Sequence, residues 1–185
     1  MDKPTLHGDG IDLRPIRSED ARPMFEAGFD RELNRLTGSH QRHSLSAVQA
    51  HCRRVGAAAD RYDFGIWVRG ALVGEVVLSD VSPENRSAAL RIAIWRSDSR
   101  DKGFGTAALR LVLDYAFVRL SLNRLELEVY AFNPRARRVY EQLGFVAEGV
   151  RRQALWWDNE PVDAIVMALL AADYRSSRRA AGAGR

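Results

Sequence analysis

Two glycines stand where an apolar segment gives way to a long helical pattern, and they constrain the fold of this chain more than any other feature. The apolar segment ends at Trp95, a polar loop follows, and Gly103-Phe104-Gly105 opens a helix predicted over residues 106–120. Glycine allows positive φ and lets backbone N–H groups approach a ligand closely. A helix start adds unpaired N–H donors and the positive end of the helix dipole. The segment therefore predicts a phosphate or pyrophosphate site at a strand-to-helix junction, with positive charge added by Arg100 and Lys102.

Short apolar segments separated by turn signals precede this junction. Alternating patterns predict strands over residues 11–14 and 88–95, and short apolar runs predict strands over residues 64–68 and 72–78. Residues 20–60 are predicted to be helical, with a break near Thr37-Gly38-Ser39. The turn signal Arg69-Gly70-Ala71 joins two of the strands into a hairpin. The first half is therefore expected to combine helices with an antiparallel meander.

The second half alternates helices and strands. Strands are predicted over residues 125–129, from Phe145, and over residues 162–170. Asn133 precedes a proline, which is typical of an N-cap followed by proline at the first helical position, and Gly144 would end that short helix. This order of elements predicts an α+β fold with a mixed sheet.

Length and composition set the outer bounds. The 185 residues suffice for one domain, expected over residues 1–174, and residues 175–185 are expected to form a disordered basic tail. No apolar run approaches the roughly 18 residues of a membrane span, and no signal-peptide pattern opens the chain. The single cysteine, Cys52, fits a reducing compartment, so we expect a cytoplasmic protein. The net charge of +4 suits an anionic ligand without choosing among nucleotide cofactor, acidic partner and nucleic acid.

Two other interpretations of the glycine segment compete with a ligand site of this kind. It could be a purely structural turn. Residues 103–108 also fit the Gly-x-Gly-x-x-Ala pattern of dinucleotide-binding folds, with Glu126 at about the distance of a ribose contact. That pattern should follow its strand almost directly, within parallel βαβ units. Here seven residues separate Trp95 from Gly103, and an antiparallel meander precedes them.

With Arg100 included, the segment reads Arg-x-x-Gly-x-Gly, which resembles the acetyl-CoA signature of the GNAT N-acetyltransferase superfamily. Asn133, then Tyr140, then Leu143-Gly144-Phe145 resemble the second half of the same domain. The resemblance covers roughly residues 9–174. It implies an enzyme that moves an acetyl group from acetyl-CoA directly to a primary amine in a ternary complex.

Two further segments, Leu122-Asn123-Arg124 and Glu148-Gly149-Val150-Arg151, are similar to the branch that holds ribosomal-protein N-terminal (alanine/serine) acetyltransferases. Spermidine and antibiotic acetyltransferases share these sequence features, so the acceptor could be a protein N-terminus or a small-molecule amine. No membrane or direct nucleic-acid partner is expected. Trp156-Trp157 could form a lip over the acceptor site, or belong to the core or to a homodimer surface.

The resemblance also implies a three-layer fold, with helices on both faces of a mixed sheet that splays apart at the acetyl-CoA site. The pantetheine arm would lie in the split and the pyrophosphate on the N–H groups of residues 102–106. The cofactor contacts expected from the resemblance are Ile94, Trp95, Arg96, Arg100, Asp101, Lys102, Gly103, Phe104, Gly105, Thr106, Asn133 and Tyr140. No metal site is assigned.

Tyr140 matches the family tyrosine that can protonate the departing CoA thiolate, although a packed aromatic is the alternative. Asn133 would add a cofactor contact to its capping role, and both residues enter the expected catalytic set.

The general base is open. Relatives in this branch often carry glutamate where this chain has Arg91, and serine where it has Ala136. Glu75, Glu126 and Glu128 are the remaining carboxylates, and strand alternation favours a solvent-facing position for each. Glu75 is the candidate base, and a water chain is the other route. The departures leave a non-catalytic acyl-CoA-binding or ribosome-associated module as the alternative function.

Overall fold

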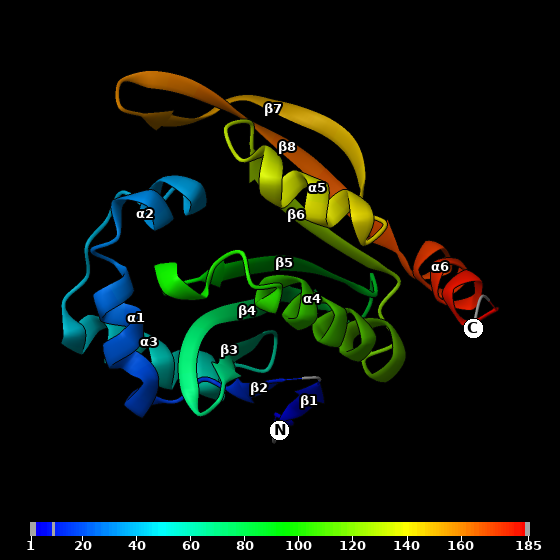
Figure 1. Ribbon diagram of the computed structural model, residues 1–185, viewed down its shortest axis with the longest axis horizontal. Helices are drawn as coiled ribbons and strands as arrows, with labels where there is room; N and C mark the ends of the chain where they lie inside the picture. Colours follow the sequence, from blue (N-terminus) through cyan, green and yellow to red (C-terminus); the bar gives the residue numbers. More distant parts are fainter. Residues whose placement is uncertain (1–2, 9, 184–185) are drawn as a thin grey trace.

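One mixed sheet organises the protein. The structure is a computed structural model that describes residues 3–8 and 10–183. The strands are β1 (Leu6–Gly8), β2 (Ile11–Pro15), β3 (Tyr62–Val68), β4 (Ala71–Ser82), β5 (Ser87–Ile94), β6 (Arg124–Tyr130), β7 (Val146–Trp157) and β8 (Glu160–Leu170). Within the described residues they form a sheet of order β1-β2-β3-β4-β5-β6-β8-β7 (Figure 1).

The helices occupy the connections between strands. They are α1 (Ala21–Ala27), α2 (Arg31–Thr37), α3 (Leu45–Ala57), α4 (Phe104–Asp114), α5 (Pro134–Gln142) and α6 (Ala171–Ala183). Short 3-10 helices, η1 (Ser18–Asp20) and η2 (Ser97–Ser99), precede α1 and α4, and a π-helical turn, η3 (Tyr115–Arg119), continues α4. None of the helices in the described residues is long and apolar enough to span a membrane.

The sheet splits between β5 and β6. These two strands run parallel and pair at three positions, Ser87 with Arg124, Ala88 with Leu125 and Ala89 with Glu126. Beyond Ala89 the strands diverge, whereas β6 pairs with β8 along its whole length (Figure 1). The expected splayed sheet is therefore confirmed, and β5 has an unpaired edge from Leu90 to Ile94.

Two apolar clusters lie on opposite faces of the sheet and complete the three layers. Strand alternation sends Phe64 and Ile66 of β3 into the larger cluster, under α4 and α5, and sends Trp67 toward a smaller cluster that holds residues of α1, α2 and α3. The three-layer α+β fold expected from the sequence is confirmed.

The C-terminal segment differs from the expectation of a disordered tail. Residues 175–183 continue α6, which begins at Ala171. The buried Tyr174 ring lies 5.0 Å from that of Phe117, and its hydroxyl donates to Asp114 at 3.0 Å. Arg178 forms an ion pair with the same carboxylate. These contacts join the helix to residues far away in sequence, which explains why local apolar periodicity gave no sign of it. Residues 184–185 lie outside the described part.

Other differences are local. The predicted helix over residues 106–120 begins two residues earlier and ends in the π-helical turn, and β1 was not predicted. The helical region predicted over residues 20–60 has an unpredicted break at residues 28–30, and its predicted break extends over residues 38–44. The remaining predicted elements, including the hairpin of β3 and β4, are present with small changes of boundary.

Candidate active site

The start of α4 is open to a ligand. Gly103 is its N-cap residue with φ of +80°, and Asp101 also has a positive φ of +64°. No side chain caps this helix end, and its first backbone bond runs from Ala107 N–H to the Gly103 carbonyl. The N–H groups of the preceding residues in the first turn, residues 104–106, therefore lack an intrahelical acceptor.

Gly105 faces two side chains of β5. A Cβ atom at this position would lie 3.7–3.9 Å from the side chains of Ile92 and Ile94, which is ordinary contact. Packing within the protein therefore does not require glycine at position 105. Close approach of a ligand backbone or phosphate would explain the glycine, whereas the protein's own contacts do not.

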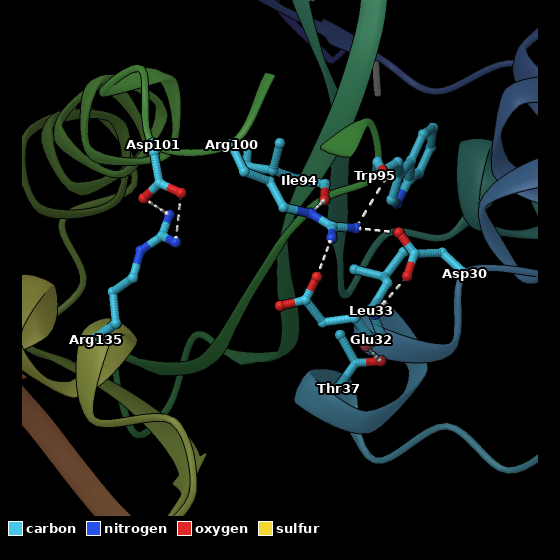
Figure 2. A network of polar contacts seen from close by, with 9 residues as sticks. All are labelled: Asp30, Glu32, Leu33, Thr37, Ile94, Trp95, Arg100, Asp101 and Arg135. Carbon is cyan, nitrogen blue, oxygen red and sulfur yellow. Dashed lines mark hydrogen bonds and ion pairs between the residues drawn. The ribbon is translucent and has the colours of Figure 1, made fainter. Parts of the chain in front are cut away.

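Arg100 points away from this helix start. Its guanidinium donates to the Ile94 and Trp95 carbonyls, each at 3.2 Å, and pairs with Asp30 at 2.5 Å and Glu32 at 3.0 Å (Figure 2). Its side chain therefore connects α2 to the end of β5. The sequence predicted that its charge would face a phosphate, and in the structure it does not.

Asp30 is well suited to this contact because it is also the N-cap of α2 and accepts from Leu33 N–H at 3.0 Å. Burial opposes ionisation of this carboxyl, but the hydrogen bonds from Leu33 and Arg100 outweigh it and lower its pKa.

The backbone groups at the end of β5 are partly occupied. The N–H groups of Trp95 and Arg96 both donate to the Val73 carbonyl, at 2.8 and 3.3 Å. The Arg96 side chain pairs with Asp98 at 2.6 Å. The expected pantetheine contacts are Ile94, Trp95 and Arg96. Of these, only Ile94 belongs to the part of β5 that has no neighbouring strand on this side. Lys102 is exposed, and Thr106 lies in the first turn of α4.

On the other side of the split, α5 carries the two remaining expected residues. Asn133 caps this helix, with its Oδ1 accepting from Ala136 N–H at 3.1 Å. Tyr140 is buried, with its ring centroid 6.0 Å from that of Phe145. Its hydroxyl makes no hydrogen bond to any described residue. Burial raises the pKa of Tyr140 to about 12, so the hydroxyl keeps its proton at neutral pH.

A pocket of about 670 Å³ lies between α1, α2, α3 and the sheet. Its apolar lining includes Phe25, Phe29 and Val48. Trp95 lines the same pocket and directly follows β5, so the strand that borders the split also contributes a wall of the pocket.

Glu75 reaches this pocket from β4. Its side chain is 12% exposed and lies 3.5 Å from Arg91 of β5. Burial raises the pKa of Glu75, and the Arg91 charge partly opposes that rise. The expectation of a solvent-facing Glu75 is wrong because β4 is a central strand covered on both faces. Glu126 and Glu128 are exposed, as expected.

Several pocket residues escaped sequence reasoning. Arg42 precedes α3, and His51 and Arg54 lie on it, and all three contribute to the lining. The helical spacing of His51 and Arg54 is a usable signal, but nothing in the sequence shows which face of the helix meets β4.

Cys52, on the same helix, is fully buried, and burial raises the pKa of its thiol to about 11. Among the residues that the structure describes, no three potential metal ligands come together.

Comparison with known proteins fits this architecture. The family model described as "Acetyltransferase (GNAT) domain" matches residues 11–146, so the chain belongs to the GNAT acetyltransferases, which use acetyl-CoA. It is 31% identical over 127 residues to "Putative ribosomal N-acetyltransferase YdaF" of Bacillus subtilis, covering 68% of each chain. It is 25% identical over 180 residues to the spermidine N(1)-acetyltransferase of Escherichia coli K12, covering 97% of this chain and 95% of the relative.

Solved structures share the fold. A spermidine N-acetyltransferase from Vibrio cholerae, in complex with CoA and spermine, superposes with a TM-score of 0.84 at 24% identity, covering 90% of this chain and 99% of that one.

Proposed function

We propose that this acetyltransferase transfers the acetyl group directly to a primary amine in a ternary complex. The observation that carries the proposal is the largely buried carboxylate of Glu75, in a pocket that is also lined by Trp95 at the end of the strand bordering the split. An amine needs a proton acceptor before it can attack, and a partly desolvated carboxylate with a raised pKa can serve as one.

The cofactor would bind along the split. The uncapped start of α4, over residues 103–106, suits the pyrophosphate, and Lys102 adds a nearby positive charge. The unpaired edge of β5, which ends at Ile94, suits the amides of a pantetheine arm. Asn133 and Tyr140 would contact it from α5. Acetyl-CoA supplies the thioester whose C–S bond breaks as the new C–N bond forms.

Proton balance assigns the remaining roles. Glu75 would accept the proton that the ammonium loses, and the Tyr140 hydroxyl would donate a hydrogen bond to the departing thiolate. The raised pKa of Tyr140, about 12, lies above the roughly 8.5 of a thiol, so complete proton transfer is uphill. Stabilisation of the thiolate by a hydrogen bond is therefore the larger part of the proposed contribution.

A non-catalytic acyl-CoA-binding or ribosome-associated module is the alternative, motivated by Arg91 and Ala136. The position of Glu75 beside Arg91 favours an enzyme. It supplies a carboxylate next to position 91, where relatives in this branch often carry glutamate. Release of CoA from acetyl-CoA with a panel of amines tests this. We expect turnover that Glu75→Gln lowers about 10²-fold and that the exposed control Glu126→Gln leaves unchanged. Cofactor binding with no turnover on any amine would favour the alternative.

We also propose a cytoplasmic homodimer, with β7 in the interface. Support comes from β7 lying at one edge of the sheet with exposed Val146, Val150 and Trp156. Sedimentation of the wild type and of Val150→Glu tests the dimer.

A further inference from the structure

Guanidinium groups without carboxylate partners line the pocket. Its ionisable lining residues are Arg42, His43, His51, Arg54, Glu75 and Arg91. Glu75 is paired with Arg91, whereas Arg42 and Arg54 form no ion pair with any described residue. Arg42 lies over the Phe29 ring, 5.5 Å from its centroid, and Arg54 donates to His51 Nδ1 at 2.8 Å. Positive charge therefore exceeds negative charge in this pocket.

His51 adds a hydrogen-bond donor to the same wall. A guanidinium can only donate, so Nδ1 of His51 accepts from Arg54 and the ring proton sits on Nε2. Burial, and then the Arg54 charge, lower the pKa of His51. The ring is thus neutral at physiological pH and offers an N–H group.

The carboxylates of α2 and the one that contacts it from the β7–β8 hairpin already have partners. Asp30 and Glu32 are bound by Arg100 (Figure 2). Asp158, at the tip of the β7–β8 hairpin, pairs with Arg31 of α2 at 3.1 Å. A ligand with several ammonium groups would therefore find one carboxylate, Glu75, and would bring its other charges close to unpaired arginines. Such like-charge contacts are unfavourable where solvent is displaced.

We propose, building on the acetyltransferase function above, that the acceptor is a primary amine that also carries a carboxylate on an apolar frame, and that polyamines are poor acceptors. The amine would lie at Glu75, the carboxylate at Arg54, and the apolar part against Phe25, with Arg42 as a second cation in the lining. Charge-assisted hydrogen bonds from a guanidinium to a carboxylate are directional, so they would also orient the amine.

Matched acceptors test the charge directly. 4-(Aminomethyl)benzoate and 4-(aminomethyl)benzamide differ in one remote charge, and the C-terminally amidated peptides Ala-Glu-Phe-NH2 and Ala-Gln-Phe-NH2 make the same comparison for a peptide N-terminus. We expect kcat/KM to be roughly tenfold higher for the charged member, with spermidine below both. A preference seen in one pair alone identifies the source as a small molecule or a peptide. A preference in neither pair, or spermidine as the better acceptor, overturns the proposal.

Variants locate the effect. Arg54→Gln should remove most of the preference for the charged member, whereas Arg53→Gln, exposed on the same helix and outside the pocket, should keep it. A preference that survives both Arg54→Gln and Arg42→Gln overturns the assignment.

Failure of the acetyltransferase function is distinguishable from failure of this proposal. If no amine releases CoA, calorimetry of the same pairs with the CoA-loaded protein decides. Tighter binding of the charged member supports the proposal without turnover, and equal or weaker binding refutes it.

Discussion

The Arg135 guanidinium holds the Asp101 carboxylate at two points, 2.8 Å from Nη1 to Oδ2 and 2.5 Å from Nη2 to Oδ1 (Figure 2). Arg135 lies at the start of α5, and Asp101 lies in the loop before α4. Because α4 follows β5 and α5 follows β6, this ion pair joins the two sides of the split sheet. Both side chains are exposed, so the pair contributes only about 0.2–1 kcal/mol to stability.

The position of the pair predicts an effect on cofactor entry. We expect Asp101→Asn and Arg135→Gln each to speed acetyl-CoA association about two- to fivefold, since either change frees the two helix starts from one another. Stopped-flow binding measures this. A purely electrostatic effect would have opposite signs in the two variants, because the ligand is an anion. Glu141→Gln, which removes the exposed Arg137 pair on α5, is the control.

Gly105 should matter for the cofactor more than for the fold. Gly105→Val places a branched side chain at the open helix start, where we expect acetyl-CoA affinity to fall about tenfold or more by calorimetry. Stability should change by less than about 1 kcal/mol, because valine has the higher helix propensity and Cβ makes ordinary contacts. Gly149→Val on β7, with open space around its Cβ, is the matched control. Unchanged affinity in the folded variant would refute the cofactor assignment.

Tyr140→Phe isolates the hydroxyl. We expect kcat to fall roughly 10²-fold with little change in acetyl-CoA affinity, since only the donor to the thiolate is lost. With a pKa of about 12, Tyr140 should give no basic limb in the pH–rate profile below about pH 11. Tyr174→Phe, which loses a bond to Asp114 far from the split, should change stability without changing kcat. A near-normal kcat in Tyr140→Phe would remove this role.

The ionisation of Glu75 should set the acidic limb of activity. Its raised pKa comes first from burial, with Arg91 lowering it, Asp63 raising it and Arg61 lowering it more weakly. A base must be ionised, so kcat/KM should fall as pH drops through this raised pKa. Removing the opposing charge in Arg91→Gln should move the limb to higher pH. A limb that does not move in this variant would assign the titration to another group.

Stability should respond in the opposite sense. Since the folded state holds the Glu75 proton more tightly than the unfolded state, its stabilising contribution is complete below the unfolded pKa and is lost as pH rises through the folded one. Glu75→Gln should therefore raise the free energy of unfolding relative to wild type more at pH 8 than at pH 4. Urea denaturation at the two pH values measures this difference.

Arg100 should be structural. Arg100→Lys cannot reproduce two carbonyl and two carboxylate contacts, and we expect a loss of about 2–3 kcal/mol in urea denaturation. Arg96→Lys, which alters one exposed pair, should cost far less.

Local signals predicted much of the fold. The Asn133 cap and the glycine at the start of α4 follow from backbone requirements a few residues long. The positions of Glu75 and Arg100 do not. Alternation along β4 shows that Glu75 faces opposite to its neighbours, but not that three helices cover its face. The Asp30 partner of Arg100 is 70 residues away, and no local pattern predicts such a contact.

The three-position seam between β5 and β6 also has a dynamic consequence. Two halves of a sheet that share so short a seam can twist against one another at little cost, and the amides along the open edge of β5 have no strand to shield them from solvent. An extended ligand that forms hydrogen bonds to this edge would take the place of the absent neighbouring strand. Amide hydrogen exchange should then slow on both sides of the gap at once, from Leu90 to Ile94 and in the first turn of α5.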